Sequence, residues 1–152
     1  SLFKWQTRNT NGGVSMMREF KIQFILEDEC IGNKVFGKLT YSLDEILEGI
    51  TNEYICEKAC ESFSPANGVE ADFKIIAKRQ FTGLQDKNGV EAYHKDIGID
   101  KFNKKVIIEW NENHLCYGLL TIDDIVKDEW NFCLKDLVEI IGNIYENKEL
   151  LG

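Results

Sequence analysis

The chain lacks several features that would assign it to a familiar class. No apolar run approaches the roughly 20 residues that a helix needs to span a bilayer, so we expect no membrane association. The five cysteines form no CxxC pair and follow no secretory leader, a pattern typical of reduced thiols in a cytoplasm. No glycine-rich loop leads into a helix that could hold a phosphate, and we expect no cofactor.

Positive charge does not balance the negative charge, with 18 Lys and Arg against 26 Asp and Glu. The formal net charge is −8, which opposes a long-range attraction to nucleic acid because that affinity depends largely on neutralised phosphates. Two small basic clusters are local exceptions: Lys74, Lys78 and Arg79, and Lys101, Lys104 and Lys105. Nucleic-acid binding is therefore an alternative function rather than the first one.

No motif has a spacing that demands catalysis or metal binding. His94 with Asp96, and His114 with Glu112, could supply an acid and a base, but on loops such pairs are usually solvated surface. Cys56 and Cys60 would share a helix face, yet both histidines are far away in sequence, which favours buried thiols over a zinc site. Glu27, Asp28 and Glu29 suit calcium or magnesium but lack the repeated spacing of a dedicated loop. We predict no enzyme and no metal site.

The clearest signal is a chain reversal between Gln80 and Tyr93. Asp86 and Asn88 are residues that bond their own backbone in turns, and Gly89 supplies a positive φ. Asp86 to Gly89 fits either a type I turn with Gly89 in a left-handed bulge or a two-residue primed turn at Asn88-Gly89. Both alternatives give a hairpin that offers Phe81, Val90 and Tyr93 to a core.

Three ordered blocks of sequence carry a resemblance to a known family. They are Met17-Arg-Glu-Phe-Lys-Ile, "RQFTGLQDKNGVEAYHKDIG" over residues 79–98 and "VEIIGNIYENKELL" over 138–151. Together they resemble the YopX family of phage and prophage proteins. The chain departs from the family's "YEGDIV" by reading Tyr93-His-Lys-Asp-Ile-Gly98, which replaces the acidic residue and the glycine before Asp96. The resemblance implies a small phage-encoded protein without an established activity.

The first half of the chain alternates between strand and helix signals. Phe20 to Leu26 has the period of two of a half-buried strand, Glu27 to Asn33 reads as an acidic turn, and 35–41 reads as a second strand. Ser42 and Glu45 form a capping box that begins a short helix. Residues 52–63 fit a second helix, although the choice between helix and strand is open, and 64–68 breaks the pattern.

The second half is richer in strand signals. Residues 71–77 lead into the first hairpin, 94–100 read as a polar loop, and 104–122 predict a second hairpin. Trp130, Phe132 and Leu134 alternate like a last short strand. Residues 135–145 can be helix or strand; Gly142-Asn143 favours a strand with a bulge. Six aromatic residues suit either a core or a stacking face of the kind that nucleic-acid-binding barrels use. The acidic charge favours the core, and joint exposure would instead favour protein binding: Phe81, Tyr93, Trp110, Tyr117, Trp130 and Phe132.

These patterns predict a β-rich α+β fold. Residues 1–16 are an extension or cloning remnant that we expect to be mobile, 17–78 an N-terminal α+β subdomain, and 79–152 a small curled sheet or SH3-like barrel. The N-terminal subdomain would add two strands and one or two helices to this sheet or barrel.

The functional expectation is an accessory phage or prophage protein that binds a host or phage protein in the bacterial host cytoplasm. Self-association is a further expectation, a nucleic-acid-associated barrel is the second hypothesis and a small hydrolytic enzyme is the third. The candidate contact residues lie in the turn and the loop after it: Asp86, Lys87, Asn88, Gly89, His94 and Asp96. The sequence does not identify the partner, the oligomeric state or the infection step.

Overall fold

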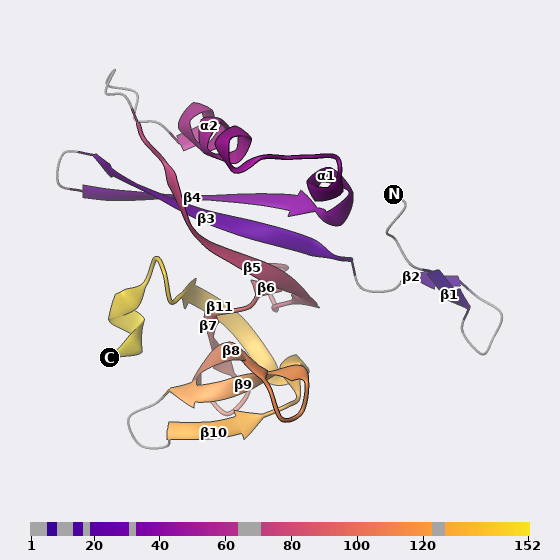
Figure 1. Ribbon diagram of the computed structural model, residues 1–152. Helices are drawn as coiled ribbons and strands as arrows, with labels where there is room; N and C mark the ends of the chain where they lie inside the picture. Colours follow the sequence, from indigo (N-terminus) through magenta and orange to yellow (C-terminus); the bar gives the residue numbers. More distant parts are fainter. Residues whose placement is uncertain (1–5, 9–13, 17–18, 31–32, 64–70, 123–126) are drawn as a thin grey trace. The chain divides into compact units, whose positions relative to one another are not determined.

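The computed structural model in Figure 1 describes residues 6–8, 14–16, 19–30, 33–63, 71–122 and 127–152. The chain forms two compact units, Ser1–Gln80 and Phe81–Gly152, and each is described by itself. Near the N-terminus, β1 (Gln6–Arg8) pairs antiparallel with β2 (Val14–Met16). The other residues of the predicted mobile extension, and the predicted break at 64–68, lie outside the described residues.

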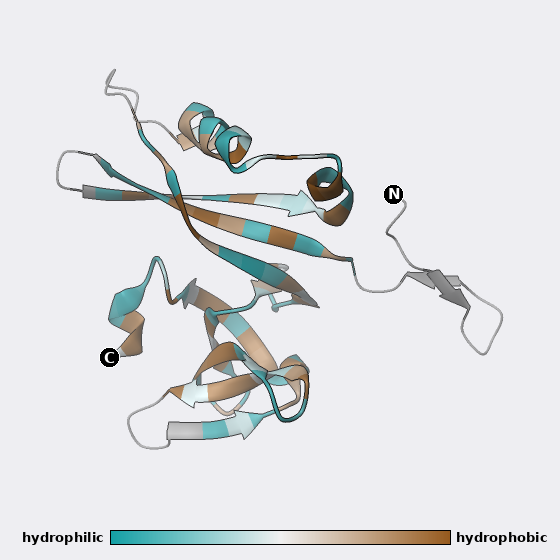
Figure 2. Cartoon of the chain, viewed as in Figure 1, coloured by the Kyte–Doolittle hydropathy of each residue, from teal (hydrophilic) through white to brown (hydrophobic). Residues whose placement is uncertain are grey.

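The first unit contains an antiparallel sheet. In it β3 (Lys21–Cys30) lies between β4 (Asn33–Ser42) and the first part of β5 (Lys74–Gln85). Figure 2 shows alternating brown and teal bands along β3, as expected of a half-buried strand. The predicted acidic turn is wrong, because β3 continues to Cys30. Asp28 can lie within the strand because its Oδ1 accepts the amide of Asp72 at 3.3 Å.

Two helices pack on β4, and Figure 1 shows them on the same face of this sheet. α1 (Leu43–Leu47) begins with the predicted capping box: Ser42 Oγ accepts the Glu45 amide at 3.2 Å, and the Glu45 carboxylate accepts the Ser42 amide at 3.2 Å. α2 (Asn52–Phe63) settles the open choice as a helix. The buried core of this unit consists of Phe24, Leu26, Tyr41, Ile55, Ala59 and Phe73, with Cys56 and Cys60 packed against it.

The second unit contains a curled five-stranded antiparallel sheet with the strand order β10-β9-β8-β7-β11. Its strands are β7 (Asp96–Asp100), β8 (Lys105–Asn111), β9 (Cys116–Ile122), β10 (Lys127–Asn131) and β11 (Leu137–Asn143). β8 and β9 are the predicted second hairpin. β11 confirms the preference for a strand, and its pairing with β7 is irregular between Ile140 and Gly142, near the predicted bulge.

The predicted polar loop at 94–100 is wrong, because most of it is the buried strand β7. Asp96 and Asp100 are only 3% and 5% exposed. Both carboxylates accept backbone amides, Asp96 from Tyr93 and Asp100 from Phe102 and Lys104. Hydrogen-bonded carboxylates can be buried at lower cost than unpaired ones, so acidic residues bound a strand here instead of marking a loop.

The first hairpin joins the end of β5 to β6 (Glu91–Tyr93), with Phe81 paired to Tyr93. Phe81 and Tyr93 are buried as expected, whereas Val90 is 48% exposed and the expectation for it is wrong. After β10, the short helix η1 (Leu134–Asp136) replaces the end of the expected strand, and η2 (Lys148–Leu151) ends the chain. The core of this unit consists of Ala92, Val106, Ile108, Leu119 and Leu137.

Gly98 lies where β11 crosses β7 closely. A Cβ at this position would be 2.4 Å from Leu137 Cδ1 and 2.7 Å from the Glu139 carbonyl oxygen. We expect Gly98→Ala to lower the free energy of unfolding by about 1–3 kcal/mol, because strand backbone cannot move aside as a flexible side chain can. Urea denaturation followed by tryptophan fluorescence measures the loss. Glu112→Ala, in an exposed turn, is the control, and equal stability of the two variants would contradict the close approach.

Candidate functional site

The Asp86 turn is held by one carboxylate. Asp86 Oδ1 accepts the amides of Asn88 at 2.8 Å and Val90 at 2.9 Å. Gly89 has a φ of +79° and its amide donates to the Asp86 carbonyl at 3.0 Å, whereas Asn88 has no positive φ. Of the two predicted alternatives, the turn is therefore the type I turn with Gly89 in a left-handed bulge.

The same carboxylate also binds a distant strand. Asp86 Oδ2 accepts the amide of Ile140 on β11 at 2.9 Å, and the Lys87 amide donates to the Val138 carbonyl at 3.0 Å. Burial opposes the charge on Asp86, but the amides of Ile140, Val90 and Asn88 outweigh it and lower the pKa of this carboxyl below its ordinary value of 3.8. The turn therefore occupies part of the outer edge of β11.

We expect Asp86→Ala to lower the free energy of unfolding by about 2–4 kcal/mol at neutral pH, because three backbone amides lose their acceptor. Since the folded-state pKa lies below the unfolded value, the charge-dependent stabilisation is present above pH ~5 and is lost as pH falls through 3.8 toward the folded-state pKa. Urea denaturation at pH 7 and pH 3 measures both effects. Lys87→Ala, which removes an exposed ion pair to Glu139, is the control with an expected loss below about 1 kcal/mol. A constant difference between wild type and Asp86→Ala across this pH range would contradict the assignment.

His94 binds Glu109 on β8, a residue that the sequence did not suggest. His94 Nε2 lies 2.8 Å from Glu109 Oε1, and Lys95 Nζ bonds to the other oxygen of the same carboxylate. Burial disfavours the charge on Glu109, yet the bonds from Lys95 and His94 outweigh burial and lower its pKa. Lys95 has a φ of +72°, in the left-handed region that a residue with a Cβ rarely adopts. The arrangement is an ion cluster at the β6–β7 reversal.

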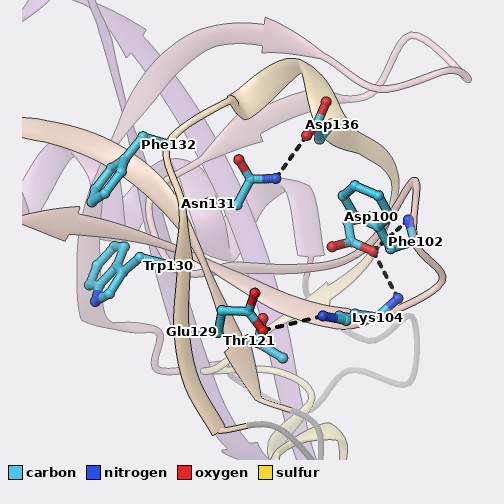
Figure 3. Close-up of a pocket in the computed structure, with 9 residues that line it drawn as sticks. All are labelled: Asp100, Phe102, Lys104, Thr121, Glu129, Trp130, Asn131, Phe132 and Asp136. Carbon is cyan, nitrogen blue, oxygen red and sulfur yellow. Dashed lines mark hydrogen bonds and ion pairs between the residues drawn. The ribbon is translucent and has the colours of Figure 1, made fainter.

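A pocket of about 500 Å³ opens beside β10 (Figure 3). Its lining combines acidic, polar and aromatic side chains: Asp100, Phe102, Lys104, Thr121, Glu129, Trp130, Asn131, Phe132 and Asp136. Asp100 and Thr121 are each 5% exposed, so they form its deep part. Lys104 Nζ lies 3.3 Å from Glu129 Oε2, and Lys101 Nζ lies 3.2 Å from Asp136 Oδ1. Three carboxylates and one amine line the pocket itself.

Asp136 is held by a second polar contact. Asn131 Nδ2 donates to Asp136 Oδ2 at 2.8 Å, and this bond, with those from Lys101 and Cys133, lowers the pKa of Asp136 despite partial desolvation. Asn131 also accepts the Cys133 amide at 2.9 Å. The end of β10 is therefore fixed to η1, and these bonds favour the charged form of Asp136.

Three rings, those of Trp130, Phe132 and His114, form a surface beside this pocket that we call the aromatic face. The Trp130 and Phe132 rings are stacked with centroids 5.6 Å apart, and the His114 ring lies 4.4 Å from Phe132. A Cβ at Gly118 would lie 3.0 Å from Trp130, so these rings lie against the β9 backbone. Phe132 is 41% exposed. Of the six aromatic residues named in the sequence analysis, Phe81 and Tyr93 lie in the core, whereas the rings of Trp130 and Phe132 are partly exposed to solvent.

Leu115 follows His114 in the β8–β9 turn and combines two unfavourable properties. Its φ is +53°, and its side chain is 71% exposed. The turn begins at Asn111, whose Oδ1 accepts hydrogen bonds from the amides of Asn113 and His114. A left-handed leucine costs roughly 1–2 kcal/mol, and this exposed side chain gains little burial in return. The stability of the fold does not explain why a leucine occupies this position.

We expect Leu115→Asn to raise the free energy of unfolding by about 0.5–1 kcal/mol, because asparagine tolerates the left-handed region through local hydrogen bonds. Leu115→Ile is the matched control, since a β-branched side chain tolerates positive φ less well and should lower stability. Chemical denaturation midpoints rank the three proteins. A less stable asparagine variant would show that the Leu115 side chain makes a stabilising contact.

The predicted contact residues form two separate features. Asp86 to Gly89 make one turn on β11, whereas His94 belongs to the ion cluster with Glu109, and Asp96 holds the Tyr93 amide. Their role in binding stays a prediction. The acidic pocket was missed, because its side chains come from four separate segments. Only the alternation of Trp130 and Phe132 could have pointed to it.

Two further findings concern metals and membranes. Among the described residues, no three His, Cys, Asp or Glu side chains gather closely enough to hold a metal ion. No helix in the same part of the chain has the length and apolar character to cross a membrane.

The chain matches the model of a known protein family. A family model described as YopX protein matches residues 31–152, which include the whole second unit. Two of the three resembling blocks lie inside this range, and Met17–Ile22 lies before it. No curated protein matches the sequence.

Proposed function

The chain belongs to the YopX protein family, and we propose that it is an accessory protein of a phage or prophage that binds another protein through the aromatic face of its second unit. The expected partner is a host or phage protein in the bacterial host cytoplasm. A second copy of the chain is the alternative partner. No catalytic step is part of this proposal.

The observation that carries the proposal is the partly exposed Trp130–Phe132 stack with His114 beside it. Aromatic side chains that stand next to a pocket are the usual anchors of protein interfaces, since they bury a large area at little conformational cost. The exposed, left-handed Leu115 next to His114 supports the same surface. A residue that destabilises its own turn is better explained by a partner than by the fold.

The charges argue against nucleic acid as the partner. In the first basic cluster, Arg79 is 4% exposed and binds Gln23 Oε1 at 2.6 and 3.0 Å. In the second, Lys101 and Lys104 bind the carboxylates of Asp136 and Glu129. A guanidinium that is 4% exposed offers little surface to a phosphate, and lysines that already pair with carboxylates release few counterions from a phosphate backbone.

Comparative affinity capture tests the proposal. Immobilised wild-type protein and Phe132→Ser are exposed to extract of bacterial host cells, with Leu151→Ser as the control because Leu151 is 46% exposed but lies outside the aromatic face. We expect the extract to contain a protein that is retained by the wild type and by the Leu151→Ser control but not by Phe132→Ser. Calorimetry with that purified protein should then show binding at least about tenfold weaker for Phe132→Ser, as for an interface hot spot.

Two results would contradict this assignment. Equal binding by wild type and Phe132→Ser would remove the aromatic face from the interface. A salt-dependent gel shift with duplex or single-stranded DNA, together with no captured protein, would support the nucleic-acid alternative instead.

A further inference from the structure

The two edges of the five-stranded sheet differ in what is bound to them. The edge strand β11 is bound along its outer side by the Asp86 turn, through the Ile140 amide and the Val138 carbonyl. At the other edge, β10 pairs with β9, and no further strand pairs with it among the described residues. An unpaired edge presents backbone donors and acceptors to another extended chain.

The β10–β9 pairing is irregular between Lys127 and Trp130, and from Glu129 to Phe132 the side chains alternate between two chemically distinct sides. Figure 3 shows Trp130 and Phe132 on one side of this strand, and Glu129 and Asn131 on the other, toward Asp100 and Asp136. A chain that pairs with β10 would follow the same period of two. Its successive side chains would reach the aromatic face and the acidic pocket in turn.

We propose that the partner is bound as an extended segment that adds a strand to the outer edge of β10, with arginine or lysine side chains in the acidic pocket and apolar side chains on the aromatic face. This proposal rests on the proposed function and specifies the chemistry of its partner. Main-chain hydrogen bonds to β10 provide general affinity, and the alternating side chains provide specificity.

Charge complementarity with the pocket favours a basic partner segment over an acidic one. The pocket is lined by the carboxylates of Asp100, Glu129 and Asp136. Lys104 pairs with Glu129 and Lys101 with Asp136, so three carboxylates face two amines. Glu129 is the most open of the three, since its side chain is 55% exposed. A guanidinium can bond two carboxylate oxygens at once and can stack on an aromatic ring at the pocket rim, where Phe102 is 61% exposed. An acidic segment would meet like charge at the same place.

Fluorescence anisotropy with the full chain and three labelled ten-residue peptides tests the inference. The first peptide alternates valine with arginine, and the second alternates valine with glutamate. The third has the sequence of the first and carries N-methyl groups on alternate amides. We expect the arginine peptide to bind at least about tenfold more tightly than either of the others, and its affinity to fall as salt is raised. Equal binding of the arginine and glutamate peptides, or no effect of N-methylation, would overturn the proposal.

Glu129→Gln tests the pocket, and Glu112→Gln is the matched control because Glu112 lies in the exposed β8–β9 turn. We expect about fivefold weaker binding of the arginine peptide to Glu129→Gln only, since the variant keeps the shape and removes the charge. Hydrogen exchange should show slower exchange of the Glu129 to Asn131 amides in the complex. The same protection in the protein alone, growing with concentration and with dimer mass by light scattering, would identify a second copy as the occupant and overturn the proposal.

The protein captured through Phe132 separates the two proposals. If that protein binds wild type and Glu129→Gln equally and leaves the β10 amides unprotected, the strand-addition proposal fails while protein binding through the aromatic face stands. If no protein is captured and no peptide binds, both fail.

Discussion

The second unit depends on short acceptor side chains that begin its chain reversals. Asp86, Asp100, Asn111 and Asn143 each accept two backbone amides from the residues that follow them. A small sheet has many reversals for its size, and each leaves amides without a strand partner. The side chains that satisfy these amides fix the directions in which the strands leave the turns. Only Asp86 also reaches a second strand, and this joins a local turn to the edge of the sheet.

These turn-forming side chains determine where the aromatic face and the acidic pocket lie. The Asp86 turn covers one edge of the sheet, and the Asp100 turn places a buried carboxylate in the deep part of the pocket at the other. The Asn111 turn carries His114 and Leu115 toward the aromatic face. The positive-φ position is filled by Gly89 in the first turn and Asn103 in the second, whereas Leu115 occupies it in the third. The turn with the least suitable residue is the one next to the exposed rings.

The local elements could be predicted from the sequence because their signals lie within a few residues. The Asp86–Gly89 turn, the Ser42–Glu45 capping box and the strand interrupted near Gly142 are of this kind. Asp28, Asp96 and Asp100 misled, because an acidic residue reads as solvated unless its amide donors are known. The site could not be predicted as a whole. Glu109 is 15 positions from His94, and the pocket joins segments that only the sheet order brings together.

The covered edge has a consequence for how the chain folds. The bond from the Ile140 amide to Asp86 joins residues 54 positions apart, and β11 is the last strand in the sequence. Such a long loop must close before the contact contributes free energy, so we expect this contact to form late in folding. During synthesis the Asp86 hairpin emerges well before its partner strand. Until residues 137–143 are available, β7 can pair only with β8 and the Asp86 carboxylate lacks the Ile140 amide, so the nascent sheet has two open edges instead of one.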